Sequence, residues 1–101
     1  MRLSPEQSQA IVRATAELAG ADARVRLFGS RLHDELRGGD IDLLVECPGK
    51  VTFPVGLATR ITARLQRVLG ERRIDVLVID AETALEPVHE VARAEGVLLT
   101  P

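Results

Sequence analysis

The first twenty residues of the chain have the pattern of an amphipathic helix. Apolar side chains recur three and four positions apart over residues 5–19, which places them on one face for burial. Ser4 and Gln7 have the spacing of a capping box, and Pro5 suits the first helical turn. Because Gly20 follows directly, we expect the helix to end there.

Two later segments repeat the helical spacing. Residues 53–69 carry an apolar stripe on one side and three arginines on the other, and Gly70 closes the segment. A shorter helical segment over residues 85–95 ends at Gly96. The expected inner stripe of the longer helix consists of Leu57, Ala58, Ile61, Leu65, Val68 and Leu69.

Between the helical segments, apolar and polar residues alternate, as in strands that turn one face to a core. The alternating segments cover residues 23–28, 40–46 and 72–80. In each of them the apolar set shares one face, so residues at the intervening positions project to the other face. A short apolar run at residues 97–99 is expected to add an edge strand.

With a short helix expected after Ser30, the order of elements is helix, strand, short helix, strand, helix, strand, helix. This order predicts one layer of sheet in an α/β (α+β) fold, with helices packed mainly on one face. The 101 residues contain no internal repeat and no linker, so we expect a single domain over residues 1–101.

Composition narrows the classes of function. Apolar residues make up 46% of the chain and charged residues 28%, which is typical of a globular protein. The formal net charge of −2 does not favour direct binding to nucleic-acid phosphates. No stretch approaches the roughly 18 apolar residues that cross a bilayer, and Cys47 has no second thiol to pair with. We therefore expect a cytoplasmic protein that does not bind membranes.

Acidic residues interrupt two of the strand patterns. Asp40 and Asp42 stand at alternate positions, hence on one face and about 6.6 Å apart, where they repel each other unless a cation intervenes. Asp75 interrupts the next strand, which in so small a sheet is expected beside the first acidic strand. Carboxylates suit Mg²⁺ or Mn²⁺, and three of them can hold two metal ions about 4 Å apart for phosphoryl transfer. One carboxylate, by preference Asp75, would take the proton of the attacking hydroxyl.

A Gly-Ser turn precedes the acidic strand. Gly29 directly follows a strand, where a glycine lets the backbone approach a ligand closely. Ser30 begins the expected short helix and offers N–H groups and a hydroxyl to an anion. Arg31 can pair with phosphate oxygens or with a surface acid. Each feature alone has a structural explanation, but their order along the chain favours a site for a nucleoside triphosphate.

The segments "FGSR", "LHDELRGG", "DIDLLVE" and "RRIDVLVID" together resemble the signature of the DNA polymerase β-type nucleotidyltransferase superfamily. They are most similar to its minimal nucleotidyltransferase (MNT) branch, in which Gly-Ser, a spacer, Asp-x-Asp and a later strand Asp follow in order. The spacer here, residues 31–39, is slightly shorter than the commonest version. The resemblance covers nearly the whole chain and implies a small mixed sheet with helices mainly on one face.

The same resemblance implies the roles of the site residues. Asp40, Asp42 and Asp75 would be catalytic carboxylates and ligands of Mg²⁺ (or Mn²⁺), with ATP as the substrate held at Gly29 and Ser30. Such proteins are commonly encoded beside a helical HEPN-type protein and act as its antitoxin. They transfer AMP to a tyrosine hydroxyl of the HEPN toxin, or mask it by binding. The resemblance thus implies protein AMPylation in a toxin-antitoxin system.

Three other functions compete with this interpretation. A transferase acting on a small-molecule hydroxyl would require an acceptor domain, which the chain lacks. A catalytically silent antitoxin would have no need of three clustered carboxylates. Nucleic-acid polymerisation would require a basic groove and a longer chain. The first two remain alternatives.

Overall fold

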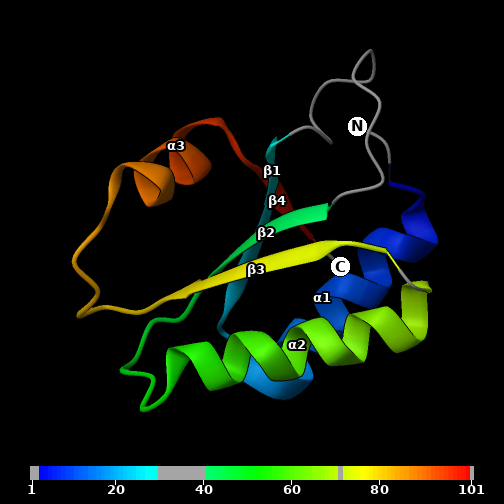
Figure 1. Cartoon of the computed structure of the whole chain (residues 1–101), viewed down its shortest axis with the longest axis horizontal. Helices are drawn as coiled ribbons and strands as arrows, with labels where there is room; N and C mark the ends of the chain where they lie inside the picture. Colours follow the sequence, from blue (N-terminus) through cyan, green and yellow to red (C-terminus); the bar gives the residue numbers. More distant parts are fainter. Residues whose placement is uncertain (1–2, 30–40, 71, 101) are drawn as a thin grey trace.

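The structure is a computed structural model that describes residues 3–29, 41–70 and 72–100. Figure 1 shows a twisted sheet with helices on both of its faces. The described elements in chain order are α1 (Pro5–Ala19), β1 (Arg24–Phe28), β2 (Ile41–Glu46), α2 (Pro54–Leu69), β3 (Ile74–Ile79), α3 (Pro87–Glu95) and β4 (Val97–Leu99). The short helix predicted after Ser30 lies outside the described residues.

The sheet is mixed, with strand order β3-β2-β1-β4. β1 runs antiparallel to both β2 and β4, whereas β2 and β3 are parallel. The parallel pair is connected through α2, because two parallel neighbours require a crossover rather than a tight turn. The predicted α+β fold and the edge strand at residues 97–99 are confirmed.

Local signals set the limits of α1 as predicted. The Gln7 N–H donates to Ser4 Oγ (3.1 Å) and the Ser4 N–H donates to Gln7 Oε1 (3.0 Å), which completes the capping box. The helix ends at Gly20, whose φ of +106° is a backbone conformation that other residues rarely adopt. Both ends of this helix are therefore determined by residues within a few positions of them.

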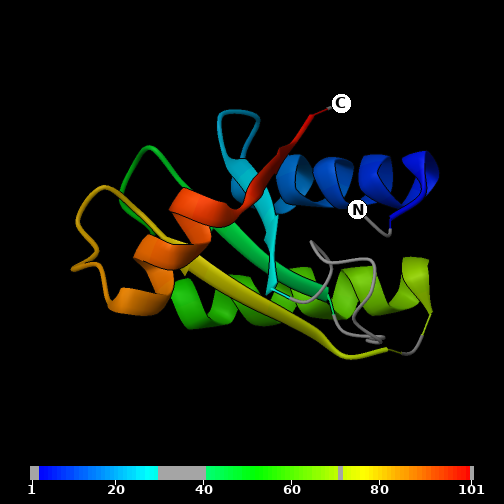
Figure 2. The same ribbon diagram turned by 90° about the horizontal axis from the view of Figure 1, so that it is seen from above.

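The main core lies between the sheet and α1 and α2, which are the two helices below the sheet in Figure 1. Figure 2 shows the same ribbon from above, with α3 in front of the sheet. Apolar residues from both helices and from all four strands are buried there, which confirms the predicted strand faces. The largest of these fully buried side chains are Ile11, Leu27, Ile41, Leu43, Ile61 and Leu65. α3 packs on the opposite face through Ala92 against Leu44 and Ile79, so the helices lie mainly, and not wholly, on one face.

One position of the predicted inner stripe is wrong. Val68 is 56% exposed, whereas Leu57, Ile61 and Leu65 are buried. The buried positions follow an i, i+4 row that continues to the partly buried Leu69, and Val68 lies beside that row. No helix in the described part of the chain is long and apolar enough to cross a membrane.

Candidate functional site

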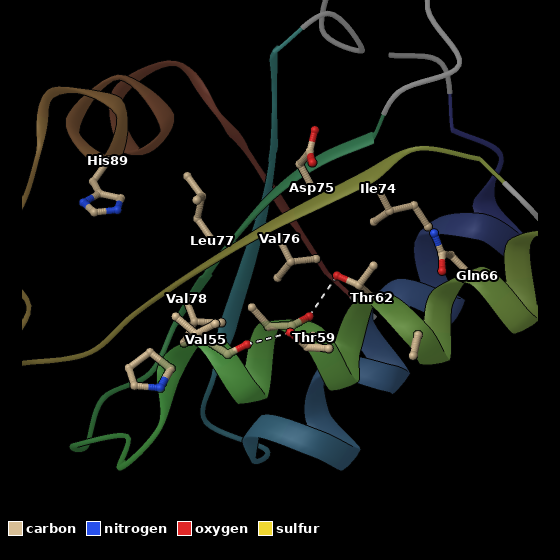
Figure 3. A pocket seen from close by; sticks show the side chains of 13 residues that line it. Val55, Thr59, Thr62, Gln66, Ile74, Asp75, Val76, Leu77, Val78 and His89 are labelled. Atoms are coloured by element: carbon tan, nitrogen blue, oxygen red, sulfur yellow. Dashed lines mark hydrogen bonds between the residues drawn. The ribbon is translucent and has the colours of Figure 1, made fainter.

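Two of the predicted acidic residues lie side by side in the sheet. Asp42 on β2 and Asp75 on β3 are direct partners in the parallel register. Adjacent strands are about 4.8 Å apart, and equivalent positions of a parallel pair project to the same face. Figure 3 shows Asp75 on the side of β3 that faces away from α2. The structure therefore confirms that the two acidic strands are neighbours and brings their carboxylates to one face.

Gly29 lies at the end of a third strand, β1, beside the two acidic residues. It directly follows β1, whose last residue, Phe28, is the antiparallel partner of Asp42. The φ of Gly29 is +77°, in the left-handed region. A Cβ added to Gly29 would overlap Asp42 Oδ2, so only glycine lets the backbone lie against this carboxylate. The end of β1 and the starts of β2 and β3 thus converge at one point of the sheet.

The other predicted site residues, Ser30, Arg31 and Asp40, lie outside the described residues. Within 3–29, 41–70 and 72–100, no group of three or more His, Cys, Asp or Glu side chains is arranged to hold a metal ion. Asp42 and Asp75 supply hard oxygen donors next to each other, which suits Mg²⁺ or Mn²⁺. These two residues therefore fit the predicted metal, and the role of Asp40 stays a prediction.

An arginine that sequence reasoning missed lies beside Asp75. Arg73 Nε is 3.3 Å from Asp75 Oδ2, and the two side chains are 72% and 51% exposed. Ion pairs this exposed contribute little, about 0–1 kcal/mol, so Asp75 can exchange this partner for a cation or a substrate. Because side chains alternate between the two faces of a strand, Arg73 and Asp75 share one face, and this signal in the sequence could have revealed the ion pair.

A groove with a volume of about 510 Å³ runs along the outer edge of β3, between this strand and α2 (Figure 3). Asp75 and His89 line it on the face of the sheet that carries Asp42 and Asp75, here called the acidic face. The Nδ1 atom of His89 accepts the N–H of Glu86 (3.1 Å) and so helps to begin α3, as a half-buried structural residue. The wall formed by α2 carries no charge, and its residues include Val55, Ala58, Thr59, Thr62, Ala63 and Gln66.

Asp80 is an acidic residue with a structural role that the sequence pattern did not reveal. Its Oδ2 accepts the N–H of Val51 (2.7 Å), and its Oδ1 accepts the N–H of Glu82 (2.8 Å) and the hydroxyl of Thr83 (3.1 Å). These hydrogen bonds, first of all the one from Val51, lower the pKa of Asp80 below its ordinary value. Asp80 therefore joins the loop after β3 to the loop before α2.

We expect Asp80→Asn to lower the melting temperature at pH 7, because the neutral amide accepts these hydrogen bonds less strongly. Since folding lowers the pKa of Asp80, its charged form stabilises the fold above the unfolded pKa of about 3.9. That contribution disappears as the pH falls further through the folded pKa. The difference between the melting temperatures of the two proteins should therefore become smaller as the pH is lowered from 7 to 2.5. A difference that stays constant over this range would contradict the role assigned to the Asp80 charge.

Cys47 is buried, as predicted for a small apolar residue at a strand end. Burial raises the pKa of its thiol, and the negative charge of Asp80 raises it further. A thiol that stays protonated at neutral pH is a poor nucleophile and a poor metal ligand. Cys47 therefore has no part in the candidate site.

Comparison with known proteins agrees with the geometry of this site. The family model described as nucleotidyltransferase domain matches residues 9–95. This range runs from within α1 to the end of α3 and includes Gly29, Asp42 and Asp75. No curated protein and no solved structure matches the chain.

Proposed function

The chain belongs to the nucleotidyltransferase domain family, and on this premise we propose that it transfers AMP from ATP to a hydroxyl of a helical HEPN-type partner protein. The acceptor is a tyrosine of that partner, and its modification silences a toxin, so the chain acts as an antitoxin. The family membership supports the nucleotidyl transfer. The acceptor, the nucleotide and the antitoxin role are the proposed part.

The observation that carries the proposal is the convergence of Gly29, Asp42 and Asp75. Two carboxylates lie next to each other at the starts of adjacent strands, where like charges repel unless a cation lies between them. The backbone of Gly29 lies against one of these carboxylates. Such crowding of a backbone turn and two acids suits the binding of a metal-bound triphosphate.

In the proposed reaction, the oxygen of the acceptor hydroxyl forms a bond to the α-phosphorus of ATP. The bond between that phosphorus and the bridging oxygen breaks, and pyrophosphate leaves. The carboxylate of Asp75 takes the hydroxyl proton, because Asp75 is exposed whereas Asp42 is half-buried, so a second protein can reach it. Asp42 and Asp40 would hold the metal together with Asp75, and Ser30 and Arg31 would hold the phosphates.

Mg²⁺, when bound, supplies positive charge that neutralises the triphosphate and favours ionisation of the attacking hydroxyl. The chain's own contribution is to position the carboxylates that would bind the metal. Because Asp42 and Asp75 are fixed by strand pairing and not by a loop, their spacing is set by the sheet. A site built on paired strands is held more rigidly than one built on loops.

The composition of the chain is consistent with a separate acceptor. Residues 1–101 contain no Tyr, so a tyrosine hydroxyl must come from outside these residues. They contain no Trp and two Phe, which leaves little aromatic surface for stacking a base. A partner that completes the binding site for the nucleotide would fit this composition.

The test is intact-mass spectrometry of the protein that co-purifies with the chain, after incubation with ATP and Mg²⁺. We expect this protein to gain the mass of one or more AMP units, and peptide mapping to place the gain on a tyrosine. A reaction with Asp75→Asn in place of the wild type serves as the control and should give no gain. A tight complex that never gains mass would contradict transfer and favour an antitoxin that acts by binding only.

A further inference from the structure

β3 is an outer strand of the sheet, and half of its backbone hydrogen-bonding groups point away from the sheet. The Ile41 N–H donates to the Arg73 C=O (3.0 Å), so Arg73 turns its groups toward β2. Because these groups alternate along a strand, Ile74, Val76 and Val78 turn theirs outward. In the part of the chain that the structure describes, no strand pairs with β3 on this outer side. The edge can therefore accept another strand.

The open edge passes directly beside the candidate site. Asp75 lies within β3, and its side chain is 51% exposed on the acidic face of the sheet. A segment that pairs antiparallel with β3 places one residue opposite Asp75, on the same face and with Cβ atoms about 4.5–5.5 Å apart. Since Asp75 turns its own N–H and C=O toward β2, this pair is of the non-hydrogen-bonded type, in which side chains are closest. A hydroxyl at that position would meet the catalytic carboxylate.

The other face of the open edge offers an uncharged surface. Val55 on α2 is 71% exposed beside the groove. Thr59 Oγ1 donates to the Val55 C=O (2.9 Å) and Thr62 Oγ1 donates to the Ala58 C=O (2.8 Å). Because both hydroxyls are satisfied within the helix, covering this wall would leave neither of these donors unpaired. Alternate side chains of a docked segment would thus enter a groove that favours apolar or small residues.

Charges of opposite sign at the two ends of the edge would orient a docked segment that is itself charged. Arg72 and Arg73 precede β3, and Asp80 and Glu82 follow it. A segment with an acidic residue near the arginines and a basic residue near Glu82 would complement both ends. Electrostatic complementarity of this kind selects orientation and register more than it adds affinity.

From these observations we propose that the protein acceptor docks as an extended strand on the outer edge of β3. Its hydroxyl-bearing side chain lies opposite Asp75, and the flanking side chains lie against the uncharged wall that α2 forms. This inference rests on the proposed function and adds the way in which the acceptor is recognised. Backbone pairing supplies affinity, and the groove selects the alternate side chains.

The first test compares Val76→Pro with Val76→Thr. The Val76 N–H points outward, so proline removes a donor of the open edge without removing a hydrogen bond to β2. Threonine keeps both the N–H and the branched side chain and is the matched control. With the acceptor that gains AMP in the mass assay, we expect KM for the acceptor to rise at least tenfold in Val76→Pro relative to Val76→Thr. Equal KM values in two folded variants would overturn the docking mode.

The second test uses the wild-type chain and does not depend on catalysis. We expect the acceptor, added in Mg²⁺-free buffer, to slow amide hydrogen exchange at least tenfold at Ile74, Val76 and Val78. The amides of Asp75 and Leu77, which already face β2, should change little. Unchanged exchange at the three outward amides would overturn the proposal, even where Val76→Pro does not fold.

Two further outcomes separate this inference from its alternatives. In the first, hydrogen exchange at the outward amides slows when the concentration of the chain is raised without any acceptor, and it is fast again in Val76→Pro. This result would show that β3 pairs with a second copy of this chain and would overturn acceptor docking. A wild-type chain that transfers no AMP would overturn the proposed function and the docking mode together. Normal transfer with equal KM values in the two variants would overturn the docking mode alone.

Discussion

Asp42→Asn should lower the rate of AMP transfer by about three orders of magnitude, which corresponds to about 4 kcal/mol in the activation free energy. The amide keeps the shape of the side chain but loses the negative charge that would hold a divalent cation. Because Asp42 lies beside Asp75, removal of one charge also relieves repulsion between them. We therefore expect the variant to stay folded in EDTA.

Asp22→Asn is the matched control for this variant. Asp22 is an exposed residue in the turn between α1 and β1, far along the chain from the acidic strands. The same chemical change at this position should leave the rate of transfer within about twofold of the wild type. The rates are measured by the mass assay, and the melting curves are recorded with and without Mg²⁺ and ATP. A fully active Asp42→Asn protein would refute the role assigned to this carboxylate.

Gly29→Ala should lower both stability and activity. A non-glycine residue at a φ of +77° costs roughly 1–2 kcal/mol, which lowers the melting temperature by about 5–15 °C for a domain of this size. In addition, the new Cβ would overlap Asp42 Oδ2 and push the carboxylate out of its place. We expect transfer to fall at least about a hundredfold, because small displacements of catalytic groups cost factors of this order.

Gly20→Ala separates these two effects. Gly20 also has a positive φ, +106°, but no atom lies within 4 Å of an added Cβ. This variant should therefore lose stability by a comparable amount and keep its activity at temperatures where it is folded. If both alanine variants lost activity equally, destabilisation would explain the result, and the contact between Gly29 and Asp42 would have no special role.

Local patterns predicted the secondary structure well because its signals are local. The capping box at Ser4 and the glycine after α1 are hydrogen-bonding and backbone features of neighbouring residues. The two-residue period of a strand determined that Asp42 and Asp75 face away from the main core. These predictions required no knowledge of which element packs against which.

Predictions failed where the outcome depended on packing. Val68 fits the helical period of the inner stripe, yet it is exposed because the buried positions of α2 form a single row through Ile61 and Leu65. No role was predicted for Asp80, because its main hydrogen-bond donor, Val51, is far from it in sequence. Contacts between residues distant in the chain leave no periodic signal.

The sequence by itself determined the helices, the faces of the strands and the acidic residues from which a nucleotidyltransferase site would be built, since each depends on the order and spacing of nearby residues. Only the tertiary structure decided that β2 and β3 pair in parallel with Asp42 opposite Asp75, and that Gly29 lies against Asp42. It also decided that, among the described residues, no strand pairs with the outer edge of β3 beside Asp75. The physical reason is that strand order and register minimise the free energy of the whole core, to which residues distant in the sequence contribute together.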